Sequence, residues 1–284
     1  MHNKWSWFKL TLLTSVMFLI NYTATSQQTC NDFNIKGEIF QQNNRCVVVP
    51  DMLSTFGTQV SIRNIRVVLP EDYKLQSSSL PVVYFFMPYI GDSSSYTDSL
   101  FINYFTGIKN KGILVCVEML QETDSITQND FRKSMSGLFN KSLKPWINAT
   151  FKCQSSPATT IVSGIQEGAD VALYLALELP SIIGKAGIFS PVMNNSEEEK
   201  TMALDLGKNY TNKIFFYNLA SEDKVGLNKL ENITDILGLQ TSVMIYKILD
   251  ENYTDEKFDW QKWFPEFLKW MYASGYNYVM KDVD

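Results

Sequence analysis

The stretch Ser163-Gly164-Ile165-Gln166-Glu167-Gly168 decides the fold of this chain. It follows an apolar, strand-like run at 159–162 and precedes an amphipathic helical pattern at 169–178. A strand, a sharp turn and a helix in this order are the setting of a nucleophile elbow, whose motif is G-x-S-x-G. Gln166 stands in the place of the serine, and a carboxamide does not form a covalent acyl intermediate. The sequence therefore predicts the frame of a reactive site without its reactive atom.

The first residues have the pattern of a secretory signal. Lys4 and Lys9 precede an apolar run at 10–20, and small polar residues follow as far as Ser26. We expect cleavage near Ser26, with an uncleaved signal anchor as the alternative. No later stretch approaches the roughly 18 consecutive apolar residues that a membrane helix needs. The protein is therefore predicted to be secreted, with no membrane span after cleavage.

The remainder of the chain reads as one domain. We expect the signal peptide at 1–26 and a single α/β domain at 27–284, with a polar leader at 27–44 and a frayed tail at 275–284. Apolar runs alternate with helical patterns, which predicts a mostly parallel sheet with helices on both faces and an antiparallel N-terminal edge. The predicted strands are 46–49, 60–69, 81–87, 113–118, 159–162, 186–189, 213–218 and 242–249, and the predicted helices are 100–109, 131–147, 169–178, 227–237 and 260–273.

The charge balance argues against nucleic acid as a partner. Without Lys4 and Lys9, 23 basic residues face 30 acidic ones, a net charge of −7 that offers no basic excess for phosphates. Glu197-Glu198-Glu199 and the segment 250–259 are interpreted as solvated loops, with a weak calcium site as the alternative. No cofactor or metal is expected, because the only histidine is His2 and the cysteines are expected to be oxidised.

Four cysteines in an exported chain favour two disulfides. The preferred pair joins Cys30 to Cys46, which would tie the polar leader to the first strand, and it leaves Cys116 to pair with Cys153. A buried free thiol is the alternative for Cys116, because it lies within an apolar run. Sequons also predict a glycoprotein. They begin at Asn140, Asn148, Asn194, Asn209, Asn232 and Asn252.

Several segments together resemble the opening, elbow and closing motifs of one family. They are 66–73, which reads RVVLPEDY, 80–85, which reads LPVVYF, the elbow with its helix at 164–177, the strand at 184–191 and the terminal helix at 260–270. These segments are similar to the putative-esterase branch of the α/β-hydrolase superfamily, which contains enterochelin-esterase-like and S-formylglutathione-hydrolase-like enzymes. The resemblance spans about 60–270 and implies an α/β-hydrolase fold.

The resemblance assigns roles to the elbow. It places the nucleophile at Gln166, between Gly164 and Gly168, and one oxyanion donor at the backbone N–H of Glu167. A second donor would come from the loop at 87–90. The carboxylate of Glu167 would oppose negative charge that develops beside these donors.

The rest of a serine-histidine-acid triad is incomplete. The resemblance places the acid at Glu222 or Asp223 and the histidine near Tyr253, where the sequence has no imidazole. A serine nucleophile needs a proton acceptor. The missing histidine and the missing serine therefore both predict a catalytically degenerate site. Ser163 and Ser190 flank the elbow, but neither is expected at its strained tip, and each would require a lysine as its base.

We interpret the chain as a secreted, catalytically degenerate esterase-like pseudoenzyme that binds an extracellular ligand or protein or serves a structural role. A pocket would lie near Tyr89, Gln166, Ser190 and Tyr253. The alternative is an active extracellular carboxylic-ester hydrolase with a rebuilt site. A third hypothesis is an interaction protein that assembles through its surface.

Overall fold

The computed structural model describes the part of the chain that forms the sheet and most of its covering helices. The described residues are 40–42, 46–50, 60–70, 73, 78–88, 112–121, 127–192, 196–206, 213–219, 232–239, 244–250 and 260–272. The predicted signal peptide, the predicted helix at 100–109 and the predicted tail at 275–284 lie outside them.

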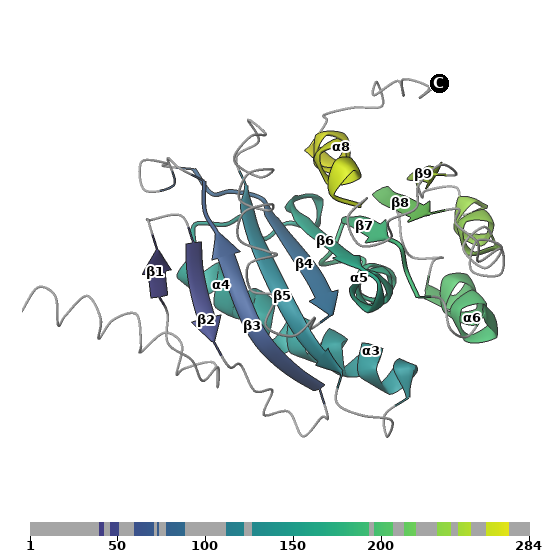
Figure 1. Ribbon diagram of the computed structural model, residues 1–284, viewed down its shortest axis with the longest axis horizontal. Coiled ribbons are helices and arrows are strands. Elements are labelled where there is room, and N and C mark those ends of the chain that lie inside the picture. Colours follow the sequence, from purple (N-terminus) through teal and green to yellow (C-terminus); the bar gives the residue numbers. More distant parts are fainter. Residues whose placement is uncertain are drawn as a thin grey trace, which may run out of the picture.

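Nine strands form one sheet in the order β1-β2-β3-β5-β4-β6-β7-β8-β9, which Figure 1 shows from left to right. The strands are β1 (Phe40–Gln42), β2 (Cys46–Pro50), β3 (Val60–Val68), β4 (Val82–Pro88), β5 (Ile113–Gln121), β6 (Thr160–Ile165), β7 (Lys185–Phe189), β8 (Lys213–Leu219) and β9 (Met244–Asp250). Strands β1 to β3 pair antiparallel, and β3 pairs antiparallel with β5. All other pairs are parallel. The predicted α/β fold with an antiparallel N-terminal edge is confirmed, and β1 adds a strand within the predicted polar leader.

Helices follow the strands along the chain. They are α3 (Gln128–Leu138), the π-helical segment η2 (Phe139–Leu143), α4 (Lys144–Thr150), α5 (Glu167–Glu178), α6 (Ser196–Leu206), a helix over 232–238 and α8 (Trp260–Tyr272). The helix predicted at 131–147 is therefore interrupted by a π-helical turn, and the helix of the elbow begins two residues earlier than predicted. Among the described helices, none has the length and apolarity to cross a membrane.

Two apolar cores lie on opposite faces of the sheet. Strand β4 is buried along Val82–Met87, and its alternate side chains enter different cores. Tyr84 and Phe86 pack with α3, α4 and α5 in the first core, whereas Phe85 packs with α8 in the second. Continuous apolar sequence in this strand is explained by burial on both faces.

Helix α8 covers the second core with large aromatic residues. Phe267 contacts Phe189 and Phe215 of the sheet with ring centroids 5.6 and 5.5 Å apart. Gly187 makes room for it, because a Cβ atom there would lie 2.4 Å from the Phe267 ring. The ammonium group of Lys185 donates a hydrogen bond to the carbonyl of Met271, near the end of α8. The large apolar side chains of this helix are therefore used for packing on the sheet.

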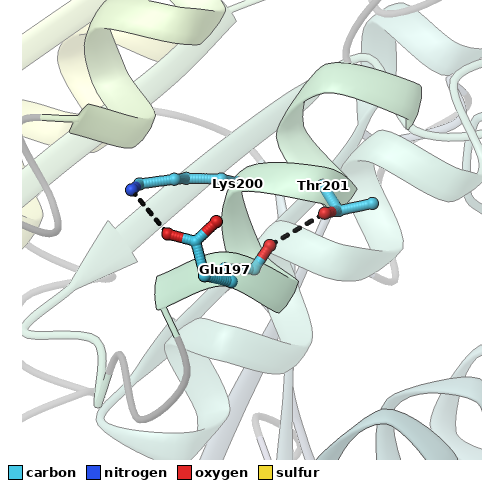
Figure 2. Close-up of polar contacts among 3 residues, drawn as sticks. All are labelled: Glu197, Lys200 and Thr201. Carbon is cyan, nitrogen blue, oxygen red and sulfur yellow. Dashed lines mark hydrogen bonds and ion pairs between the residues drawn. The ribbon is translucent and has the colours of Figure 1, made fainter.

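The acidic stretch Glu197-Glu198-Glu199 lies in α6, so its interpretation as a loop is wrong. Lys200 pairs with the carboxylate of Glu197 at 2.9 Å, and the Thr201 hydroxyl donates to the Glu197 carbonyl at 2.8 Å (Figure 2). Acidic side chains in a first helical turn interact favourably with the helix dipole. This stabilisation was overlooked because the stretch was interpreted by its charge alone.

Cys116 and Cys153 carry free thiols, so the pairing predicted for them is wrong. Cys116 belongs to the core beneath α8, whereas Cys153 packs against the core on the other face of the sheet. A disulfide requires Cα atoms within about 7 Å, and these two residues are separated by the thickness of the sheet. The buried free thiol considered for Cys116 is what the structure has. The pair Cys30–Cys46 stays a prediction, because Cys30 lies outside the described residues.

Candidate functional site

Gln166 adopts the strained backbone of an elbow tip. Its φ is 52° and its ψ is −124°, a conformation that costs a non-glycine residue about 1–3 kcal/mol. The Gln166 N–H donates to the carbonyl of Phe189 at 3.1 Å, and its own carbonyl accepts from the N–H groups of Ala169 and Asp170 at 2.9 and 3.3 Å. The turn is therefore held from the neighbouring strand β7 and from the first turn of α5.

Two glycines allow the elbow to close. A Cβ atom on Gly164 would lie 2.2 Å from the backbone oxygen of Gly168, and one on Gly168 would lie 2.2 Å from the backbone oxygen of Phe86. Because both contacts are to backbone atoms, no side-chain rotation would relieve them. The glycines that flank Gln166 are thus required by the approach of α5 to strands β6 and β4.

Ser190 is a second polar residue with left-handed backbone at the same edge of the sheet. Its φ is 46°, and it follows Phe189, which is the register partner of Ile165. Gln166 and Ser190 therefore leave adjacent strands side by side, each half-buried. Ser190 is not the tip of the elbow, as expected, but its positive φ was not predicted, because serine at this position gives no signal for left-handed backbone.

Ser163 takes no part in the exposed edge. Its side chain is fully buried, and its hydroxyl donates to the carbonyl of Gly187 at 2.9 Å. A hydroxyl that is committed to a neighbouring strand beneath the surface cannot attack an external ester. Ser163 is therefore removed from the two serines considered as replacement nucleophiles, and Ser190 remains.

A buried polar cluster lies beneath the elbow, between α5 and α3. Asp170 accepts a hydrogen bond from Gln128 Nε2 at 2.8 Å and lies 3.9 Å from the guanidinium group of Arg132. The side chains of Arg132 and Asp170 are 3% and 2% exposed. On the same helix, burial and then a hydrogen bond to Glu178 raise the pKa of Tyr174. The sequence carried one overlooked signal for this cluster, a lone aspartate within the apolar helix A-D-V-A-L.

Several predicted site residues lie outside the described part of the chain. These are Tyr89, Glu222, Asp223, Tyr253, Asn194, Asn209 and Asn252. The roles proposed for them, and for the loop beyond Pro88, therefore stay predictions. The sequon residues Asn140, Asn148 and Asn232 are described and exposed. Within the described ranges, no three histidine, cysteine, aspartate or glutamate residues gather in a group that could hold a metal ion.

The family follows from a sequence match over most of the chain. The model of the family described as "Putative esterase" matches residues 60–270. The chain belongs to this esterase family. The matched region begins at β3 and ends within α8. It therefore contains the elbow, the helix α5 that follows it and the neighbouring helix α3.

Solved esterase structures share the fold. A ferulic acid esterase is 10% identical, with a TM-score of 0.60, and the alignment covers 80% of this chain and 98% of that one. An S-formylglutathione hydrolase from Agrobacterium tumefaciens is 11% identical, with a TM-score of 0.59 and coverages of 84% and 98%. A ferulic acid esterase from Anaeromyces mucronatus, solved with ferulic acid, is 14% identical, with a TM-score of 0.57 and coverages of 84% and 94%. No curated protein matches the sequence significantly.

Proposed function

We propose that this protein is a secreted pseudoenzyme of the esterase family, which binds a ligand at its elbow without hydrolysing it. The observation that carries the proposal is Gln166 at the strained tip, where the family motif has serine. A carboxamide at this position donates and accepts hydrogen bonds but does not form an acyl-enzyme. The elbow then presents a recognition group in place of a nucleophile.

The absence of a suitable base supports the same proposal. The sequence has a single histidine, His2, which precedes every described element. Ser163 is buried and bonded to Gly187, and Ser190 would need a base other than histidine. A hydroxyl without a base of near-neutral pKa is a weak nucleophile.

The elbow has the position of a ligand site in an α/β sheet. Gln166 and Ser190 stand at the carboxyl ends of β6 and β7, where ligands bind in open parallel sheets. The half-buried carboxylate of Glu167 opens α5 directly behind Gln166. Negative charge at this place disfavours anionic ligands, so we propose a neutral ester or a similar uncharged polar group as the ligand.

Ester hydrolysis is the first test. The full chain, produced in a secreting eukaryotic host, is assayed with 4-nitrophenyl acetate, and we expect no turnover above the buffer rate. Gln166→Ser is expected to be equally inactive, because no histidine activates the new hydroxyl. Turnover that is abolished by Ser190→Ala would establish an active esterase with a rebuilt site and overturn the proposal.

Ligand binding is the second test, and methyl ferulate and ferulate are suitable probes because an esterase of similar fold was solved with ferulic acid. We expect calorimetry to show that methyl ferulate binds and survives intact, with weaker binding of the anionic ferulate. Gln166→Ala should weaken the binding of methyl ferulate about threefold to tenfold, the value of one or two hydrogen bonds. Equal binding by the wild type and Gln166→Ala would place recognition elsewhere.

Secretion and glycosylation are proposed with the function. Asn140, Asn148 and Asn232 are exposed in the described structure and available to carry glycans. A decrease in mass after treatment of the secreted protein with peptide N-glycosidase is expected, and retention of an unmodified chain inside the producing cells would contradict this part.

A further inference from the structure

Asn148 begins a complete sequon at the end of helix α4. The sequon Asn148-Ala149-Thr150 forms the last three residues of this helix, and Asn148 is exposed. The Thr150 hydroxyl donates to the carbonyl of Trp146 at 2.8 Å, so it does not compete for the amide of Asn148. A glycan on this asparagine would extend into solvent.

A thiol lies against the Asn148 side chain. Cys153 Sγ is 3.1 Å from Asn148 Oδ1 and donates to it, and it lies 3.7 Å from the carbonyl oxygen of Ile147. Burial raises the pKa of this thiol, which favours the protonated form that donates. Backbone contacts fix its position, because Cys153 forms a bridge with Leu80, whose N–H donates to the carbonyl of Lys152 at 2.9 Å.

No other cysteine of the described ranges is within reach of Cys153. Cys116 lies on the opposite face of the sheet. Cys46 belongs to β2, which β3 and β5 separate from β4, a distance of three strand spacings or about 14 Å. Cys30 is outside the described residues and is predicted to pair with Cys46. Because Cys153 is half-exposed, its thiol would react with external disulfides in a secreted chain unless access to it is blocked.

The covalent geometry of a glycosylated asparagine directs the sugar towards this thiol. The oligosaccharide replaces a hydrogen atom on Nδ2 and leaves Oδ1 as an acceptor. Because Nδ2 and Oδ1 of one amide are ~2.2 Å apart, Nδ2 of Asn148 lies within about 5 Å of Cys153 Sγ. An N-substituted amide prefers the trans form. The first sugar carbon therefore lies on the same side of the Cγ–Nδ2 bond as Oδ1, which is the side of the thiol.

We propose that Asn148 carries an N-linked glycan whose first sugar covers the Cys153 thiol and blocks its reaction with external disulfides. This inference rests on the secretion and glycosylation proposed above. The hydrogen bond from Cys153 persists in the glycosylated chain, because its acceptor Oδ1 is not the atom that carries the sugar. The glycan thereby keeps a half-exposed thiol reduced in an oxidising compartment.

The test measures the access of a small disulfide to Cys153 in the full chain, secreted by a eukaryotic host. The Cys153 thiolate attacks one sulfur of dithiodipyridine, forms a mixed disulfide and releases thiopyridone, which is followed by its absorbance. Thr150→Ala removes the sequon and leaves Asn148 and Cys153 in place. We expect this variant to react about tenfold faster than the wild type, because its thiol is uncovered. Cys153→Ser should abolish the reaction, since Cys116 is buried.

Asn140→Gln is the matched control. Asn140 is exposed and begins a sequon eight residues before Asn148, about 12 Å along the helical segment, so its loss should leave the reaction rate unchanged. Near-ultraviolet circular dichroism verifies the fold of each variant, and Asn148→Gln, which removes the same glycan, keeps the proposal testable if Thr150→Ala does not fold.

Peptide mass spectrometry reports which sequons carry a glycan. An unmodified Asn148 in a chain that is glycosylated at Asn140 or Asn232 would overturn this inference alone. Equal reaction rates in the wild type and Thr150→Ala, or an equal increase in Asn140→Gln, would also overturn it. A secreted chain without any glycan would overturn the proposed glycosylation as well.

Discussion

The two ends of the parallel strands differ in their backbone conformation and in their buried polar side chains. At the carboxyl end, the backbone is unusual: Gln166 and Ser190 have positive φ, and glycines permit contacts that no Cβ atom would allow. At the amino end, none of the described non-glycine residues has a positive φ, but Lys144 and Tyr84 bring polar atoms into the core. Strain is therefore concentrated in the main chain at the carboxyl end, where Arg132 and Asp170 also bury their charges beneath the elbow, whereas the amino end buries polar side chains on unstrained backbone.

This contrast shows which part of the family motif is kept when glutamine stands in the place of serine. The elbow is determined by backbone contacts between β6, β4 and α5, and these do not depend on the side chain at its tip. Serine can be replaced by glutamine without loss of the packing that defines the fold. The following predictions test the contrast, from the largest expected effect on stability to the smallest.

Asp170→Ala should have the largest effect. It leaves the guanidinium group of Arg132 buried without its carboxylate, and breaking a buried ion pair in this way costs about 3–5 kcal/mol. The measurement is the free energy of unfolding in urea. Arg132→Met with Asp170→Leu, which removes both charges, should recover most of the loss. A single variant as stable as the wild type would show that the elbow helix does not depend on this pair.

Gly168→Ala should cost about 3 kcal/mol, because its Cβ would lie 2.2 Å from the backbone oxygen of Phe86. Gly137→Ala is the matched control, since no atom lies within 4 Å of its Cβ position and it is within α3. The control should be stabilised by about 1 kcal/mol, because alanine is the better helix former. Urea unfolding measures both, and equal changes in the two variants would refute a steric elbow.

Gln166→Gly should stabilise the protein by about 1 kcal/mol or more, since glycine adopts the backbone of the elbow tip without strain. Gln166→Ala, which removes the same carboxamide but keeps a Cβ atom, separates strain from side-chain contacts. We expect thermal unfolding to show a higher Tm for the glycine variant than for the alanine variant. Equal Tm values would mean that the tip carries no strain.

Lys144→Met should have the smallest effect at neutral pH, a gain of up to about 1 kcal/mol. The sign of this change follows from the pKa of Lys144. Burial lowers this pKa in the folded state, so the charged ammonium group destabilises the folded protein at pH values below the lowered pKa. This cost disappears as the pH rises towards the ordinary value of 10.5. The advantage of the methionine variant should therefore decrease between neutral and alkaline pH, and a constant difference in urea unfolding would contradict the assignment.

The sheet was predictable because its strands carry strong and simple patterns. Strand β4 is apolar at every buried position, which indicated a central strand, and the alternation in β3 indicated an edge with one solvated face. The elbow was predictable for a different reason. Glycines two residues before and after Gln166, at a turn between a strand and a helix, are typical of the nucleophile-elbow motif.

The errors arose where long-range contacts decide the outcome. Spacing in the sequence does not reveal that Cys116 and Cys153 lie on opposite faces of a sheet. Nor does it reveal that Asp170 meets Arg132, because their helices are brought together only by packing on the same core.

Gly187 connects the elbow strand to the final described helix. Its missing Cβ atom admits the Phe267 ring on one side, and its carbonyl accepts from Ser163 of β6. Phe189 and Phe215 on the same face therefore have no α8 to pack against until α8 has been synthesised. A chain still on the ribosome exposes these rings for as long as translation of the C-terminal third takes, so chaperones that recognise aromatic surface should bind the nascent chain during that interval.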